Sequence, residues 1–300
     1  MTPRPHAALA VIAFLVLAAC GTSKTEPESA ATAADSGTPV LISADWGRTK
    51  LAEGRGPAGT VLSATEGVAA VETGYGGRYV DALAGEAGDG ARDWVFWMNG
   101  IESDLGAAEL EAADDDRVWW DIHRWAGRVH VPAIVGQWPA PLSRDLDGPV
   151  SGVTADPAAA EALRAAGVDA AAPAAPAGPR AIVGASAALA ERDPTWRAAL
   201  ADPGRAGLTA WFDGDRAVVW DAEAGQAVPV PSATAVIVAT TDDFTAHGAP
   251  VVVIAGRTDA AAQAAAQALA DNPLLSQRHV AICLDADALI VCSGGRGATT

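Results

Sequence analysis

The sequence predicts an α+β protein with two small domains, an N-terminal one over residues 40–142 and a C-terminal one over residues 181–300. Three observations support this fold class. Short strand-like segments recur along the chain, one helix-spaced segment lies among the strands of the first half, and an Ala-rich helix lies between fully apolar strands in the second half. The length of 300 residues agrees with two domains.

The first domain is expected to begin with a strand at residues 40–46, then a turn and a weaker strand at residues 47–56. Apolar residues between Val61 and Val71 have a helix-like spacing, and Thr60 is a candidate N-cap for that helix. Further strands are expected at residues 78–83, 94–99 and 117–123, with a turn at Asn99-Gly100. One helix among several strands indicates an α+β domain.

Residues 143–180 form an Ala/Pro-rich linker with a short helix at 157–166, for which Asp156 is the expected N-cap. In the second domain we expect helices at residues 194–201 and from Thr258 or Asp259 to 270. Strands are expected at residues 181–184, 208–212, 217–221, 233–239, 251–255, 280–284 and 289–292. Apolar strands beside an Ala-rich helix indicate a compact α/β or α+β layer.

The first residues resemble a bacterial lipoprotein signal. Arg4 is followed by an apolar run of 13 residues, 7–19, which is too short to span a bilayer. The run ends in Leu17-Ala18-Ala19-Cys20, the pattern of a lipobox. We therefore expect a signal peptide at residues 1–19, lipidation of Cys20, a tether at residues 20–39 and an extracytoplasmic, membrane-anchored location. The alternative is an ordinary signal peptide with a chance cysteine.

The formal net charge is −17. Proteins that bind nucleic acid need basic patches to meet the phosphates, so this charge argues against a nucleic-acid partner. It also argues against electrostatic adhesion to anionic lipid. Membrane attachment would therefore depend on the lipid anchor.

Cys283 and Cys292 flank two strand-like segments joined by the turn Asp285-Ala286-Asp287. A disulfide across the two strands suits an exported protein. Two free, buried thiols are the alternative, because neighbouring strands do not by themselves provide disulfide geometry.

Six of the ten Trp residues lie between Trp94 and Trp138. Strand alternation places Trp94 and Phe96 on one face of their strand and Trp97 on the other. It likewise separates Trp119 and His123 from Trp120. One face must cover the helix, and the other is either a second core or an exposed aromatic platform for a large, flat ligand.

Several motifs of the first domain occur in an order that resembles a known family. They are Tyr75-Gly76-Gly77-Arg78-Tyr79-Val80, Asp93-Trp94-Val95-Phe96-Trp97-Met98-Asn99-Gly100-Ile101-Glu102, Gly106-Ala107-Ala108 and Asp116-Arg117-Val118-Trp119-Trp120-Asp121. With the segments at 42–47 and 60–67, they resemble the transcobalamin-like C-terminal domain over roughly residues 40–130. Asp115-Asp116 stands where that family usually has Gly-Asp in the turn.

The resemblance implies a β-grasp-like first domain and a corrinoid, such as cobalamin, as a ligand rather than a cofactor. A cobalt-ligating imidazole would be His123 or His130. The expected ligand-binding face comprises Trp94, Phe96, Trp97, Asn99, Trp119, Trp120, His123 and Trp125.

The sequence contains no convincing catalytic or metal-binding pattern, so we expect a protein that is not an enzyme. Asp114-Asp115-Asp116 lacks the alternating ligands of a calcium loop. The leading hypothesis is an exported lipoprotein that binds a small molecule in support of uptake by a membrane importer. The alternative is a protein-interaction module that docks on a neighbouring lipoprotein or transporter subunit and has no ligand of its own.

Overall fold

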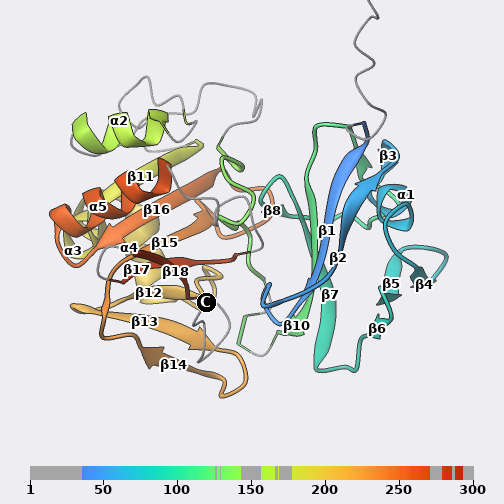
Figure 1. Cartoon of the computed structure of the whole chain (residues 1–300). Helices are drawn as coiled ribbons and strands as arrows, with labels where there is room; N and C mark the ends of the chain where they lie inside the picture. Colours follow the sequence, from blue (N-terminus) through green and yellow to red (C-terminus); the bar gives the residue numbers. More distant parts are fainter. Residues whose placement is uncertain are drawn as a thin grey trace, which may run out of the picture. The chain divides into compact units, whose positions relative to one another are not determined.

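The computed structural model of the chain describes residues 36–125, 127–128, 130–142, 157–165, 168, 178–270, 279–285 and 288–292. The expected signal peptide, Cys20 and most of the tether and linker lie outside the described residues. Ser36–Thr300 form one compact unit, distinct from Met1–Asp35. Within the described part, strands in several sheets predominate and helices are few, in a mixed α and β fold (Figure 1). No helix of that part is both long and apolar enough to cross a membrane.

The first sheet has five strands in the order β2-β1-β10-β7-β8. Its strands are β1 (Thr38–Ala44), β2 (Thr49–Gly56), β7 (Arg92–Met98), β8 (Ile101–Glu102) and β10 (Val118–Arg124). β1 runs parallel to β10, and the other neighbouring pairs are antiparallel. The expected strands of the first domain are present, and the Asn99-Gly100 turn joins β7 to β8 with positive φ at both residues.

Helix α1 (Val61–Glu66) covers one face of this sheet. Thr60 caps it as expected, because its side-chain oxygen accepts a hydrogen bond from Ser63 N. The helix expected to reach residue 71 ends at Glu66, since Gly67 is its C-cap and Val71 begins the next strand. Two small sheets complete this half: β3 (Gly59–Thr60) with β9 (Glu111–Ala112), and β4 (Val71–Gly74) with β5 (Tyr79–Leu83) and β6 (Glu86–Ala87).

The second sheet has the order β11-β16-β15-β17-β18. Its strands are β11 (Arg180–Ala185), β15 (Ala233–Thr241), β16 (Pro250–Gly256), β17 (Ile282–Asp285) and β18 (Ala288–Val291). The central strands are largely apolar, apart from Thr234, Thr240 and Thr241 of β15, as suits a sheet that is covered on both faces. Helix α5 (Asp259–Ala270) packs on one face, and Thr258 caps it through Ala261 N.

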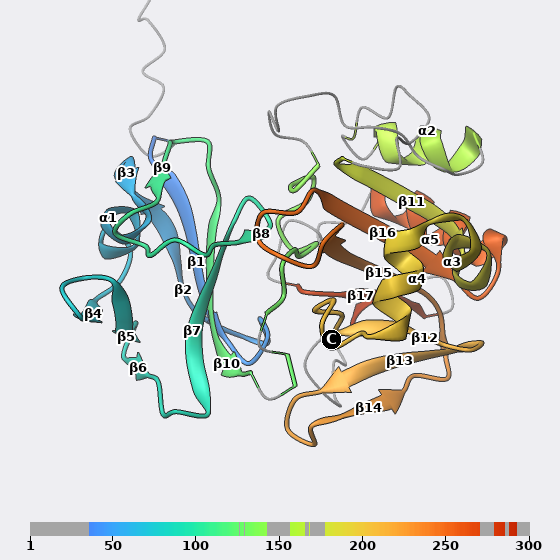
Figure 2. The same cartoon turned by 180° about the vertical axis from the view of Figure 1, so that it is seen from behind.

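The opposite face is covered by two helices and a small sheet (Figure 2). These elements are α3 (Ser186–Arg192), α4 (Pro194–Ala201), β12 (Ala210–Asp213), β13 (Arg216–Asp221) and β14 (Gln226–Pro229). The expected helix at 194–201 coincides with α4, whose N-cap is Asp193. α3 and β14 were not expected from the sequence.

Residues 133–142 follow the first sheet and contact both sheets, because Ile134 packs with Trp97 and Trp119 of the first sheet. Ala133, Val135, Trp138 and Leu142 share a core with α5 and with Leu163 of helix α2 (Pro157–Ala165). The first half of the chain is thereby joined to the second sheet through side chains as well as through the backbone.

Candidate functional site

The aromatic residues of β7 and β10 divide between two cores. Trp94, Phe96 and Trp120 lie in the core that α1 covers, and Trp97 and Trp119 lie on the other face of the sheet. This is the alternation that strand geometry predicts. All five side chains are at most 8% exposed.

The face that carries Trp97 and Trp119 is covered by the chain itself. The two rings lie 5.0 Å apart between centroids, and their core also contains Val131, Ile134, Ala222 and Val280. Trp97 Nε1 donates to the carbonyl of Val131 (2.8 Å), and Trp119 Nε1 donates to Ser43 Oγ (2.7 Å). This face of the sheet was expected to be either a second core or an exposed aromatic platform, and the structure shows a second core. The exposed platform is wrong for these side chains, because neither their surfaces nor their N–H groups are open to a ligand.

His123 is equally enclosed. Its ring is 2% exposed, its Nδ1 lies 2.8 Å from Asp121 Oδ1, and it stacks on Trp46 with 3.7 Å between the ring centroids. The carboxylate of Asp121 also accepts hydrogen bonds from Ser43 Oγ (2.6 Å) and Trp46 N (2.9 Å). Ser43 and His123 thus both bind Asp121 rather than each other, so this buried network holds the β1 end in place and is not a nucleophile–base pair.

Asn99 and Trp125, the other two residues of the expected binding face, differ in their surroundings. Asn99 accepts a hydrogen bond from Arg117 N (3.0 Å) and donates to Asp116, which fixes the hairpin turn. Trp125, just after β10, is 40% exposed. It is the one member of the expected tryptophan set whose ring the structure leaves substantially accessible.

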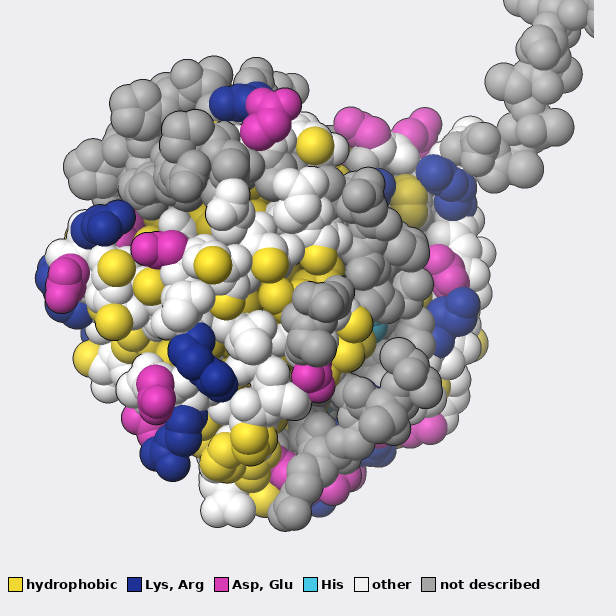
Figure 3. Space-filling model, turned by 60° about the vertical axis from the view of Figure 1, so that its left-hand side comes forward, with side chains coloured by type: hydrophobic (Ala, Val, Ile, Leu, Met, Phe, Trp, Pro, Cys, Tyr) yellow, Lys and Arg dark blue, Asp and Glu magenta, His cyan; other side chains and the backbone are white. Residues whose placement is uncertain are grey.

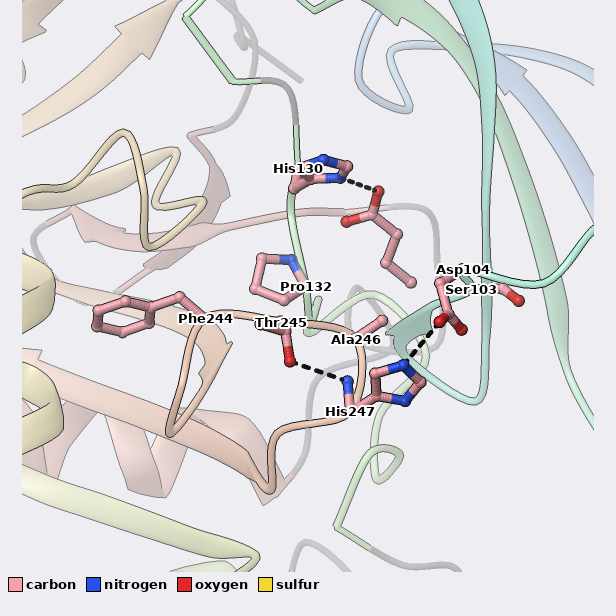
Figure 4. Close-up of a pocket in the computed structure, with 9 residues that line it drawn as sticks. Ser103, Asp104, His130, Pro132, Phe244, Thr245, Ala246 and His247 are labelled. Atoms are coloured by element: carbon pink, nitrogen blue, oxygen red, sulfur yellow. Dashed lines mark hydrogen bonds and ion pairs between the residues drawn. The ribbon is translucent and has the colours of Figure 1, made fainter.

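A pocket of about 310 Å³ lies where three segments meet (Figure 4). These segments are the end of β8 with the two residues after it, the extended stretch around residue 130, and the loop between β15 and β16. The lining residues are Glu102, Ser103, Asp104, His130, Pro132, Phe244, Thr245, Ala246 and His247. Its volume falls at the lower end of the range of ligand cavities, roughly 300–1,000 Å³.

Glu102 and His130 form one imidazole–carboxylate pair of this lining. His130 Nδ1 lies 3.1 Å from Glu102 Oε1, and Glu102 Oε2 accepts the backbone N–H of Val131 at 2.8 Å. Glu102 is only 9% exposed, whereas the His130 side chain is 71% exposed. Burial raises the pKa of the Glu102 carboxyl, and the hydrogen bond from His130 opposes that rise.

His247 and Asp104 form the second pair, with 2.7 Å between His247 Nε2 and Asp104 Oδ2. The loop that carries His247 is held by its own hydrogen bonds. Thr241 Oγ1 donates to the carbonyl of Thr245 (2.7 Å), and Asp243 accepts from both N and Oγ1 of Thr245. The β15–β16 hairpin therefore presents an imidazole to the segment that follows β8.

The described lining is mixed in chemistry. It combines apolar surface from Pro132, Phe244 and Ala246 with two carboxylates and two imidazoles. Its two hydroxyls are engaged in local bonds, Ser103 with Leu105 and Thr245 with Asp243. Among the described residues, no group of three or more metal-ligating side chains converges on one point.

The sequence predicted only part of this pocket. Among the pocket residues, His130 was considered as a ligand to cobalt, whereas Glu102 was noted only within the family motif. No role was predicted for the loop residues 244–247, which lie more than 100 positions further along the sequence than the other lining residues. The signal that could have identified them is the polar loop between two largely apolar strands, which contains Asp242, Asp243 and His247.

Arg128 helps to hold the 130–132 wall of the pocket. Its side chain is 4% exposed, its guanidinium lies 4.2 Å from the Trp220 ring centroid and 5.3 Å from that of Trp211, and its Nε donates to the carbonyl of Leu208 (2.7 Å). Burial lowers the pKa of Arg128 to about 10. At neutral pH it is a buried cation that ties the segment after β10 to β12 and β13.

Cys283 and Cys292 are joined by a disulfide, with 5.6 Å between their Cα atoms. Cys283 lies in β17, and Cys292 follows the paired strand β18. The structure therefore has the disulfide rather than the two free thiols.

Residues 58–124 match the family model described as Domain of unknown function (DUF4430), a family associated with transcobalamin-like domains. The matched segment extends from the residue before β3 to the end of β10 and contains Glu102, Ser103 and Asp104 of the pocket. No curated protein and no solved structure matches the chain.

Proposed function

We propose that this protein is an exported, lipid-anchored lipoprotein that binds a small molecule and does no chemistry on it. The observation that carries the proposal is the pocket at Glu102, His130 and His247, where apolar surface and a few polar groups meet between the two halves of the chain. Ligand sites occur preferentially at such junctions, on mostly apolar surface with few polar groups.

Export and anchoring rest on the first twenty residues. The apolar run at 7–19 and the lipobox ending in Cys20 support signal-peptide cleavage and lipidation. The Cys283–Cys292 disulfide supports a location outside the cytoplasm, where disulfides persist. The protein would then hold its ligand at the outer face of the membrane for transfer to an importer.

For the first half of the chain, we propose the transcobalamin-like, β-grasp-like assignment. The match at residues 58–124 supports it, as does a five-stranded sheet with a parallel β1–β10 pair and one helix on its face. The aromatic strands are in this reading a structural core, and the pocket beside β8 is the binding site.

A corrinoid such as cobalamin is the second candidate ligand, and His130 is the observation that favours it. Its ring is exposed, and its Nδ1 is engaged by a buried carboxylate, which leaves Nε2 outward. A carboxylate behind a histidine is a common arrangement for a metal-ligating imidazole. The pocket would hold only part of such a ligand, because about 310 Å³ is small for a large flat molecule.

The docking alternative is supported by exposed apolar side chains around the β4–β5 hairpin. Tyr75 is 89% exposed, Tyr79 42% and Leu105 47%. Gly106, next to Leu105, lies against the backbone of Arg78, which brings these segments together. Such a surface suits a protein partner better than a small ligand.

The test is a binding screen with the full-length chain in lipid nanodiscs, using saturation-transfer NMR with a set of small amines, acids and alcohols, and calorimetry with cobalamin. Ala246→Trp would fill the pocket, and Ala224→Trp places the same side chain at an exposed turn outside it. We expect binding that Ala246→Trp abolishes and Ala224→Trp retains. Binding that survives in both variants would show that the pocket is not the binding site. The absence of any binding would favour the docking alternative.

A further inference from the structure

The charge of the pocket is set by two carboxylates. Among the described residues that line it, Glu102 and Asp104 are acidic and none is Lys or Arg. The lining therefore carries two carboxyl groups and no Lys or Arg side chain to balance them. Glu102 is also almost fully buried, where a carboxylate attracts a cation more strongly than in bulk water.

The polar groups of the lining are mainly hydrogen-bond acceptors. His130 uses Nδ1 toward Glu102, and His247 uses Nε2 toward Asp104. The ring nitrogens outside those two pairs, His130 Nε2 and His247 Nδ1, belong to side chains that are 71% and 76% exposed. A neutral imidazole that donates to a carboxylate through one ring nitrogen accepts a hydrogen bond at the other. A ligand that donates hydrogen bonds therefore suits this lining better than one that accepts them.

The two pairs lie apart on the lining, with Pro132 and Ala246 drawn between them (Figure 4). The apolar surface between the pairs suits an uncharged body on the ligand. The His247–Asp104 pair is exposed, and exposed pairs contribute little to stability. An incoming cation can therefore replace His247 at Asp104 at small cost.

We infer that the pocket binds a compact organic ammonium ion, that is, a primary or similar amine attached to an apolar group. This inference rests on the proposed function, since it names the ligand class of the same pocket. The ammonium group lies against the carboxylate of Asp104 in place of His247, and the apolar group contacts Pro132, Phe244 and Ala246. The carboxylate of Glu102 adds to the negative potential of the pocket. Electrostatic complementarity of this kind selects among ligands of equal shape.

Three probes with one carbon skeleton test the inference: 2-phenylethylamine, 2-phenylethanol and phenylacetate. Isothermal titration calorimetry on the full-length chain in nanodiscs, with empty nanodiscs as the blank, gives each affinity. We expect the amine to bind at least about tenfold more tightly than the alcohol, and phenylacetate not to bind. Asp104→Asn, at an exposed position, and Glu102→Gln should each weaken binding of the amine about tenfold.

Glu223→Gln is the matched control, because Glu223 is 80% exposed in its pair with Arg48 and does not line the pocket. It removes one negative charge and should leave binding of the amine unchanged. If phenylacetate or the alcohol binds as tightly as the amine, and Ala246→Trp abolishes that binding, the ligand class is wrong while the pocket function stands. If no probe binds, and the wider screen also finds none, both proposals fail.

Discussion

The carboxylate of Glu102 has two roles: it lines the pocket, and it accepts the backbone N–H of Val131. Burial raises its pKa above the ordinary value of 4.5. The folded state therefore binds this proton more tightly than the unfolded chain does. The contribution of Glu102 favours folding most at low pH and diminishes as the pH rises through the ordinary value toward the raised one.

Glu102→Gln should remove that contribution. We expect the variant to lose less stability than the wild type as the pH rises from 4 toward neutrality, which urea denaturation at a series of pH values would measure. Glu53→Gln, at an exposed position paired with Lys50, is the control and should follow the wild type. Parallel curves for wild type and Glu102→Gln would contradict the assignment of a raised pKa.

Trp97 is the residue whose expected and observed environments differ most. It was expected on a binding face, yet its side chain is 0% exposed and donates to Val131. Trp97→Ala should therefore reduce the free energy of unfolding by about 3–5 kcal/mol. Trp125→Ala, at a half-exposed ring, should cost about 1 kcal/mol or less. Equal effects of the two changes would argue against Trp97 as core.

At the scale of elements, the short segment after β10 connects the two sheets. Gly127 has φ +72°, and a Cβ there would lie 2.5 Å from Cζ2 of Trp220. Gly127→Ala should destabilise the fold by about 2–4 kcal/mol, through both backbone strain and overlap with the ring. Gly76 has nearly the same φ, +75°, with open space around it.

Gly76→Ala therefore isolates the cost of the backbone conformation, about 1–2 kcal/mol. Chemical denaturation of both variants measures the difference. A Gly127→Ala variant no less stable than Gly76→Ala would show that Trp220 does not pack against residue 127.

The disulfide Cys283–Cys292 links β17 to the residue that follows β18 and stabilises this strand pair locally. The bond spans a sequence separation of 9 residues, and closing a loop of that length in the unfolded chain stabilises the fold by about 2–3 kcal/mol. A Cys283→Ser/Cys292→Ser variant should lose about that much, as measured by urea denaturation. The reduced wild type should have the same urea midpoint as the double variant. A urea midpoint that does not change on reduction would argue against the presence of the disulfide.

Elements with a strong local signal could be predicted from the sequence. Helix α4 begins with an Asp cap and Pro194, and the apolar strands β15 and β16 lie between polar turns. Helix α3 was missed because it follows β11 directly and Ala185 provides no side-chain cap. Strand β14 was missed because it is short, largely exposed and contains Pro229.

At the scale of the whole molecule, the sequence could specify which residues share a strand face but not what covers that face. The cover of Trp97 and Trp119 comes from Val131, Ile134, Ala222 and Val280, which no local pattern connects. The pocket has the same origin, since its walls come from distant segments. On the face in Figure 3, basic and acidic side chains are interspersed, so that face is not a broad surface of one sign.

We propose that the pocket, and not the tryptophan strands, is the binding site. NMR spectra of the isotopically labelled full-length chain, recorded during titration with 2-phenylethylamine, distinguish the two. We expect shifts in the signals of Glu102, His130 and His247, while the indole N–H signals of Trp97 and Trp119 stay in place. Shifts confined to those two indoles, with the pocket signals unchanged, would contradict this proposal.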